Sequence, residues 1–300
     1  MKTNKTFALL IAGMICLTAC GRDVNVYNKP TAAILPIEKK YQNNGANEVS
    51  TVEFASQNDT IEKLVVAYPT TLMSSSERWP LVMTCNPSNT TGEFMMPVMK
   101  HLASWGFIVV GNMDKQTGTG HTMSITLDQF IALGETHGNL FYNKIDTARI
   151  GLMGFSQGAF GSLMAITKYA NGNRYKALYL GSCPQPLLGH NMGWGDINYS
   201  QLHTPMLHLI GDGFIDRKTI CPPDTLSMIF DQLLPSDLPA ATGRRINKDH
   251  DKIAGEGDPY MTAWFCHWLL GDPEAAKAFC GPNAELLHNE RWNQTQVRNM

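Results

Sequence analysis

The sequence predicts an α/β fold in which a mostly parallel sheet is covered by helices on both faces. Short apolar runs rich in β-branched residues alternate with segments of helical spacing, which is typical of such sheets. FIVVGN (107–112) is apolar up to its last residue and rich in β-branched residues, which is typical of a central strand. Of the 300 residues, 43% are hydrophobic, enough for a sizeable core. We therefore expect a single α/β domain over residues 51–300.

The expected elements follow one another from residue 61 onward, with turn-rich segments between them. The domain shows no internal repeat, coiled coil or low-complexity block. The expected strands cover residues 61–69, 79–85, 107–112, 148–153, 177–182, 205–211 and, more weakly, 243–247, and the expected helices cover residues 93–104, 124–138, 157–170 and 260–270.

The N-terminus has the pattern of an export signal. Lys2 and Lys5 precede the apolar stretch FALLIAGMICL, which is too short to span a bilayer comfortably. LTAC (17–20) resembles the bacterial lipoprotein signal, in which the cysteine is lipidated; an ordinary signal peptide with an incidental cysteine is the alternative. We expect a signal peptide over residues 1–20 with lipobox Cys20, a flexible tether over residues 21–50, and lipid anchoring to the bacterial cell envelope, on its periplasmic or outer face.

Charge and cysteine content limit the partners, metal sites and disulfides that we expect of this protein. The formal net charge of −2 argues against nucleic acid as a partner. No CxxC or His-x-x-His spacing suggests a metal, so none is expected. An exported location permits disulfides, with Cys266–Cys280 and Cys183–Cys221 as candidate pairs and Cys85 left over.

The stretch GFSQG (154–158) contains the candidate nucleophile. It fits G-x-S-x-G, and it lies between a predicted strand and a predicted helix, the context that a nucleophile elbow requires. Gly154 and Gly158 allow the close backbone approach of such a turn. Ser156 would then stand at a helix N-terminus, where backbone N–H groups favour developing negative charge. We expect Ser156 to be a nucleophile; a serine in a glycine-rich turn is the alternative.

A nucleophilic serine needs a base, which follows it in the chain order of this type of site. His250, in NKDHDKI, follows the last predicted strand on a loop, where the base is expected. His208 lies inside a predicted strand, His267 lies in the middle of a predicted helix, and His288 is near a polar C-terminal tail. His250 is therefore the predicted base.

For the acid that orients the base, and for the second oxyanion donor, the sequence offers two candidates each. DGFIDRK follows the strand that ends near residue 211 and offers Asp216, which we favour, and Asp212 as the alternative. One oxyanion donor is expected from the N–H of Gln157, the residue after the nucleophile. The second is expected from the loop CNPSNTTG. Pro87 has no N–H, which leaves Ser88, with Asn89 behind it.

Taken together, these residues resemble the α/β-hydrolase superfamily, and within it the secreted cutinase-like polyesterases and polyethylene terephthalate hydrolase-like esterases. The likeness covers most of residues 60–281 and rests on four stretches in the family's order: HLASWGFIVV (101–110), IDTARIGLMGFSQGAFGSL (145–163), TPMLHLIGD (204–212) and MTAWFCHWLLGDPEAAKAFCG (261–281). It implies an α/β-hydrolase fold with little or no cap, and a Ser–His–Asp hydrolase of carboxylic esters without a cofactor.

The sequence departs from that family at several positions. Pro87 stands where the family usually has glycine, Phe214 stands where it usually has aspartate, and no cysteine follows Cys280 to close the C-terminus with a disulfide. The family commonly has a tryptophan lining the substrate cleft. Trp194 lies in the corresponding region but several residues later, so that it is either a substrate-binding residue or a packing aromatic.

The leading hypothesis is thus an exported serine hydrolase, a cutinase-like carboxylesterase that acts on an ester substrate through an acyl-enzyme. An amidase, thioesterase or acyl-peptide hydrolase would use the same triad. A non-catalytic binding lipoprotein with a hydrolase fold is the alternative from a different class, because a fold does not determine a function.

Overall fold

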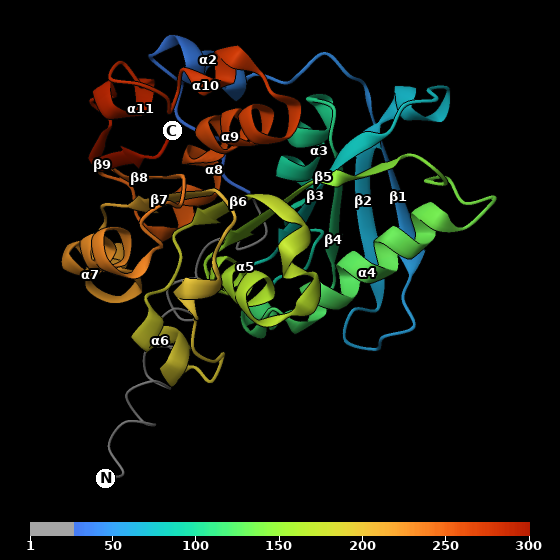
Figure 1. Ribbon diagram of the computed structural model, residues 1–300, viewed down its shortest axis with the longest axis horizontal. Coiled ribbons are helices and arrows are strands. Elements are labelled where there is room, and N and C mark those ends of the chain that lie inside the picture. Colours follow the sequence, from blue (N-terminus) through green and yellow to red (C-terminus); the bar gives the residue numbers. More distant parts are fainter. Residues whose placement is uncertain (1–26) are drawn as a thin grey trace.

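A single nine-stranded sheet forms the centre of the molecule, as the computed structural model, which describes residues 27–300, shows (Figure 1). The strands are arranged in the order β1-β2-β4-β3-β5-β6-β7-β8-β9. They are β1 (Val49–Ala55), β2 (Lys63–Pro69), β3 (Trp79–Cys85), β4 (Ile108–Asn112), β5 (Ile145–Phe155), β6 (Tyr175–Gly181), β7 (Met206–Gly211), β8 (Ala240–Arg245) and β9 (Trp292–Arg298).

The six strands in the middle of the sheet, β4-β3-β5-β6-β7-β8, run parallel. The two edges are antiparallel, with β1 and β2 added beyond β4 and β9 added beyond β8. Parallel strands need crossover connections, which here contain helices. The carboxyl ends of the parallel strands consequently meet at one edge of the sheet, where α/β proteins build their sites.

Helices cover both faces of the sheet (Figure 1). Residues of α4, α5, α6 and α7 pack on one face, and residues of α2, α3, α8 and α9 pack on the other. The helices are α2 (Pro36–Gln42), α3 (Met96–Ser104), α4 (His121–Glu135), α5 (Gln157–Lys168), α6 (Pro186–Asn191), α7 (Pro223–Met228), α8 (Ile253–Glu256), α9 (Asp258–Leu270), α10 (Pro273–Ala276) and α11 (Glu285–His288).

The alternation of side chains along each strand divides the core into two layers. In β3, Leu81 and Met83 contribute to the layer under α4 and α5, whereas Val82 contributes to the layer under α3 and α9. Helix α9 is buried almost all round, and Trp264 and Phe265 are both fully buried. Both faces of the parallel strands are therefore excluded from solvent. This explains why the sequences of these strands are apolar and do not alternate between apolar and polar residues.

The expected strands and helices of the α/β fold are present, with boundaries shifted by a few residues. Two antiparallel edge strands, β1 and β9, were not predicted. Strand β9 occupies the polar tail after His288, and its residues are mostly half-buried against β8. Edge strands expose one side of their backbone and carry polar residues, so their apolar signal is weak.

The expected tether over residues 21–50 is corrected by the structure from residue 27 onward. Tyr27 and Ile37 are buried and Tyr41 is fully buried, all three in the layer that contains α9. Residues 36–42 form α2, and β1 begins at Val49. The apolar residues of this segment are too widely spaced to show a period, and they become ordered because they pack on the domain. Residues 1–26, which include the expected signal peptide and Cys20, lie outside the described residues. Within residues 27–300, no helix has both the length and the apolar character needed to cross a bilayer.

Candidate active site

Ser156 occupies the sharp turn between β5 and α5. Its backbone has φ 56° and ψ −125°, a conformation that side chains other than glycine rarely adopt. A side chain at Gly154 would overlap the carbonyl of Gly158, and one at Gly158 would overlap the carbonyl of Cys85 at the end of β3. Both glycines of G-x-S-x-G are thus needed for the backbone approach that this strained turn requires.

His250 lies beside the serine hydroxyl. It begins a short 3₁₀ turn (His250–Lys252) after β8, and its amide donates to the Asp249 carboxylate over 2.8 Å. The distance from His250 Nε2 to Ser156 Oγ is 2.8 Å, which is a hydrogen bond. The Phe155 ring packs against the imidazole with 5.2 Å between ring centroids. The base predicted from the sequence is therefore within proton-transfer distance of the predicted nucleophile.

Asp216 lies on the other side of the imidazole. Its Oδ1 is 2.7 Å from His250 Nδ1, and its Oδ2 accepts hydrogen bonds from the Ser182 hydroxyl (2.9 Å) and the Gly211 amide (2.8 Å). The carboxylate is fully buried. Burial raises its pKa, but attraction to the His250 ring and the hydrogen bonds from His250, Ser182 and Gly211 outweigh this, so that the pKa of Asp216 lies below its usual value. Asp216 is thus an ionised partner for the ring.

Asp212, the alternative acid, points elsewhere. Its carboxylate binds the Arg217 guanidinium over 2.8 Å and lies 3.5 Å from the Asn293 amide nitrogen. The difference from Asp216 comes from the π-helical segment Asp216–Ile220, which follows β7 after a short loop and begins with the buried aspartate. A side chain at Gly211 would overlap the Asp216 carboxylate, so that glycine at the end of β7 leaves the room that Asp216 needs.

The predicted oxyanion donors lie on adjoining segments. Gln157 is the first residue of α5, where helical N–H groups have no intrahelical partner. Ser88 lies in the turn after β3, and among the described residues its amide makes no hydrogen bond, whereas the Asn89 amide donates to the Lys115 carbonyl over 2.9 Å. The buried Asn86 side chain holds this turn by donating to the carbonyls of Thr90 and Asp114. The close approach of Gly158 to the end of β3 brings this turn beside the elbow.

Trp194 is half-buried and packs on neighbouring residues. Its ring lies 5.4 Å from the Phe160 ring, centroid to centroid, and it contacts the backbone at Gly118. These contacts favour the packing interpretation of Trp194. By contrast, Phe214 is 74% exposed, two residues before Asp216.

Ser182 is a functional candidate that the sequence analysis missed. It follows β6 with a positive φ of 43°, is fully buried, and donates to Asp216. A serine after a parallel strand is too common to stand out in a sequence. Its position at the same sheet edge as Ser156 is the signal that could have identified it.

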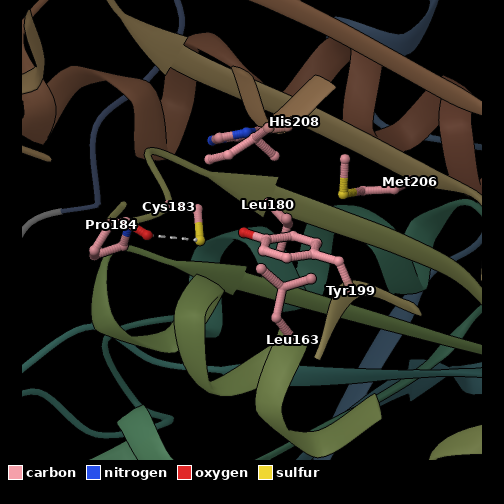
Figure 2. A pocket seen from close by; sticks show the side chains of 8 residues that line it. Leu163, Leu180, Cys183, Pro184, Tyr199, Met206 and His208 are labelled. Carbon is pink, nitrogen blue, oxygen red and sulfur yellow. Dashed lines mark hydrogen bonds between the residues drawn. The ribbon is translucent and has the colours of Figure 1, made fainter. Parts of the chain in front are cut away.

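His208, in β7, belongs to the core. It lines a cavity of about 10 Å³, too small for a substrate, together with Cys183 and Tyr199 (Figure 2). Burial, and secondarily the nearby Arg244, lower the pKa of His208 to about 4, so that it stays neutral. The eight lining residues are Leu163, Leu180, Cys183, Pro184, Tyr199, Met206, His208 and Ile229.

The cysteines and acidic residues suggest no further centre in residues 27–300. All five cysteines described there are free thiols, so neither candidate disulfide, Cys266–Cys280 or Cys183–Cys221, is formed. Burial raises the pKa of Cys183 and that of Cys221, which keeps both thiols protonated. In the same part of the chain, no group of three or more His, Cys, Asp or Glu side chains could hold a metal ion.

Comparison with protein families gives a match that covers nearly the whole chain. The family model described as "PETase: PET hydrolase-like" matches residues 29–296. No curated protein matches the sequence. The match confirms the resemblance and the α/β-hydrolase fold expected from the sequence. The chain therefore belongs to the PET hydrolase-like family, a family of ester hydrolases with the α/β-hydrolase fold.

Proposed function

We propose that the protein is an exported serine hydrolase that cleaves carboxylic esters with Ser156 as nucleophile, His250 as general base and Asp216 as the orienting acid. The observation that carries this proposal is the continuous hydrogen-bond chain from Ser156 Oγ to His250 Nε2 (2.8 Å) and from His250 Nδ1 to Asp216 Oδ1 (2.7 Å). Family membership supports ester hydrolysis as the reaction.

In the first half of the reaction, Ser156 Oγ attacks the ester carbonyl while its proton passes to His250 Nε2. Asp216, held ionised in the buried site, stabilises the imidazolium that forms. The amides of Gln157 and Ser88 donate to the oxyanion of the tetrahedral intermediate. His250 then returns the proton to the leaving alcohol, and the acyl group remains on Ser156.

In the second half, water replaces the alcohol. His250 Nε2 accepts a proton from the water as it attacks the acyl-enzyme carbonyl, and the same amides stabilise the second oxyanion. Collapse of that intermediate releases the carboxylic acid, and the proton returns from His250 to Ser156. The site ends in its starting state, so the residues named here suffice for a complete cycle.

The experiment uses mature protein, beginning after Cys20, beside its Ser156→Ala variant, on p-nitrophenyl esters from acetyl to long acyl chains. We expect hydrolysis by the parent alone. The chain-length preference would then separate a small-acyl esterase from a lipase-like enzyme, and an aromatic polyester film provides a further arm. Equal turnover by the parent and Ser156→Ala would refute the proposed mechanism.

Two related panels test the alternatives. Matched anilide and thioester substrates report an amidase or thioesterase on the same triad, because only the leaving group differs. A folded parent that is inactive on all three classes and does not react with a fluorophosphonate would favour a non-catalytic binding protein. Reaction with the fluorophosphonate would exclude that alternative.

We also propose that the protein is anchored by lipid on Cys20. LTAC followed by Gly21 supports this, as does the short apolar stretch before it. Cells that express the parent should carry the protein in the membrane fraction, whereas Cys20→Ala should release it or leave the signal peptide uncleaved. Equal membrane association of both, with the signal peptide removed from both, would refute lipid anchoring.

A further inference from the structure

The segment that precedes α2 crosses the outside of the loop that carries His250. We call residues 27–33 the N-terminal strap. The Asn28 side chain donates to the Asp251 carbonyl over 2.7 Å and accepts from the Lys252 ammonium over 3.2 Å. Asp251 and Lys252 are the two residues after His250, so Asn28 holds the 3₁₀ turn that begins with the predicted base.

A second set of strap contacts converges on Glu256, which is 5% exposed at the end of α8, the helix that directly follows the 3₁₀ turn. Its Oε1 accepts from the Thr31 amide (3.1 Å), the Thr31 hydroxyl and the Lys248 ammonium (2.8 Å). Its Oε2 accepts from Arg245 Nε over 2.9 Å. Burial raises the pKa of Glu256, but Lys248, Thr31 and Arg245 lower it further, so the carboxylate stays ionised. The buried Glu256 carboxylate thus connects Thr31 of the strap to Arg245 and Lys248, which precede His250 in the chain.

The strap also fits against the backbone on the far side of His250. A side chain at Gly255 would overlap the Asn28 carbonyl, so that the absence of a side chain there is what lets the strap lie on α8. The Tyr27 hydroxyl donates to Asp258 over 2.8 Å, and its ring lies 5.9 Å from that of Phe94, centroid to centroid. Tyr27 therefore spans from α9 to the segment between the oxyanion turn and α3.

On its inner side, the His250 loop is held by the loop that connects β7 to Asp216. The Asp249 carboxylate accepts from the amides of His250 and Ile215, and the Gly213 amide donates to the Lys248 carbonyl. On its outer side, the contacts to Asp251, Lys252, Gly255 and Glu256 come from the strap. The imidazole is therefore carried by a loop that is clamped between two segments distant from it in the sequence.

We propose that the N-terminal strap is a positioning element that keeps His250 aligned between Ser156 and Asp216. This rests on the proposed function. Loss of the strap releases the outer side of the loop, and a displacement of the imidazole by about 1 Å breaks the geometry for proton transfer, which can cost ~100-fold in rate. The strap acts through His250 and touches no substrate, so its loss lowers kcat and leaves KM nearly unchanged.

The test compares strap variants of the mature chain on p-nitrophenyl acetate. Gly255→Ala displaces the strap without altering it. Asn28→Ala combined with Thr31→Val removes the hydrogen bonds that the strap's side chains make to the loop and to Glu256, and leaves the bond from the Thr31 amide to Glu256. Lys29→Ala is the matched control, because this side chain is exposed and makes no hydrogen bond to the described residues. We expect kcat to fall about tenfold or more in Gly255→Ala and about three- to tenfold in the double variant. KM should change less than about twofold in both, and Lys29→Ala should match the parent.

Two further measurements separate positioning from mere stabilisation. Gly255→Ala added to Asn28→Ala/Thr31→Val should cause less loss than the sum of the two separate effects, because both changes weaken the same contact between the strap and the loop. The downfield proton resonance of the His250–Asp216 hydrogen bond should broaden or shift in the strap variants at temperatures where they are fully folded. If Gly255→Ala does not fold, the double variant carries the test.

Parent-like kcat and an unchanged proton resonance in folded strap variants would overturn the proposal, even if their melting temperatures fall. A fall in apparent kcat that equals the unfolded fraction of each variant, with no loss per folded molecule, would overturn it as well. Neither result would touch the proposed function, which fails only if the parent itself does not hydrolyse esters through Ser156.

Discussion

Replacing Asp216 by asparagine tests the proposed triad at its acid, for which the sequence left two candidates. Asp216 Oδ2 accepts from two donors, the Ser182 hydroxyl and the Gly211 amide, and Oδ1 faces His250 Nδ1 at 2.7 Å. In Asp216→Asn the side-chain oxygen must remain where the two donors are. The NH₂ group then faces Nδ1, which has to become an acceptor. The ring proton consequently moves to Nε2, and His250 can no longer take the proton of Ser156.

The cost follows from this wrong tautomer. A triad whose base is held in the wrong tautomer loses about 10⁴ in kcat, which corresponds to about 5.4 kcal/mol of transition-state stabilisation. Asp212→Asn is the matched control. Its carboxylate binds Arg217 on a partly exposed surface, so that its loss costs no more than about 1 kcal/mol of folding stability and leaves kcat within about threefold.

The assay measures kcat and KM of both variants on p-nitrophenyl esters, with circular dichroism as the control for folding. Asp216→Asn should retain its fold and lose nearly all activity, and Asp212→Asn should behave like the parent. A folded Asp216→Asn variant that keeps more than about a tenth of the parent activity, or an Asp212→Asn variant that loses more activity than Asp216→Asn, would refute the assignment of Asp216 as the acid.

Three further outcomes are expected. Gly158→Ala should lower the free energy of unfolding in urea by about 3 kcal/mol, because the new methyl group meets the Cys85 carbonyl; parent-like stability would contradict the packing of the elbow. Trp194→Ala should cost about 2 kcal/mol of stability through its contact with Phe160, while KM stays within about threefold; a large rise in KM in a stable variant would make Trp194 a substrate-binding residue. Burial raises the pKa of Asp258 well above its usual value, so folding takes up a proton once the unfolded chain ionises. The free energy of unfolding of Asp258→Asn relative to that of the parent should therefore increase with pH above about 4, by up to ~1.4 kcal/mol per pH unit. Urea titrations at several pH values measure this difference. A difference that stays constant with pH would contradict a protonated Asp258.

The sequence predicted the elbow well because its determinants are local. A strand, a turn with Gly154 and Gly158, and a helix follow one another within some twenty residues, and each leaves its own pattern. The central strands were equally clear because they are buried on both faces. His250 could be selected because the other late histidines fall in predicted strands, in helices or near the C-terminus.

The remaining features depend on contacts between distant parts of the chain. Asp216 differs from Asp212 only because a π-helical segment begins there and because Gly211 leaves room for the carboxylate. Ser182 and the N-terminal strap have no local signature, since their partners lie tens to hundreds of residues away. The tether predicted over residues 21–50 was wrong from residue 27 onward for the same reason, because Tyr27 and Tyr41 are ordered by the helix layer on which they pack.

The most direct test of the account is to identify the residue that a fluorophosphonate modifies. The parent should be labelled with one equivalent, on the peptide that contains Ser156, and labelling and ester hydrolysis should be lost together in Ser156→Ala. Modification of another residue, or hydrolysis that persists after Ser156 is fully modified, would contradict the account.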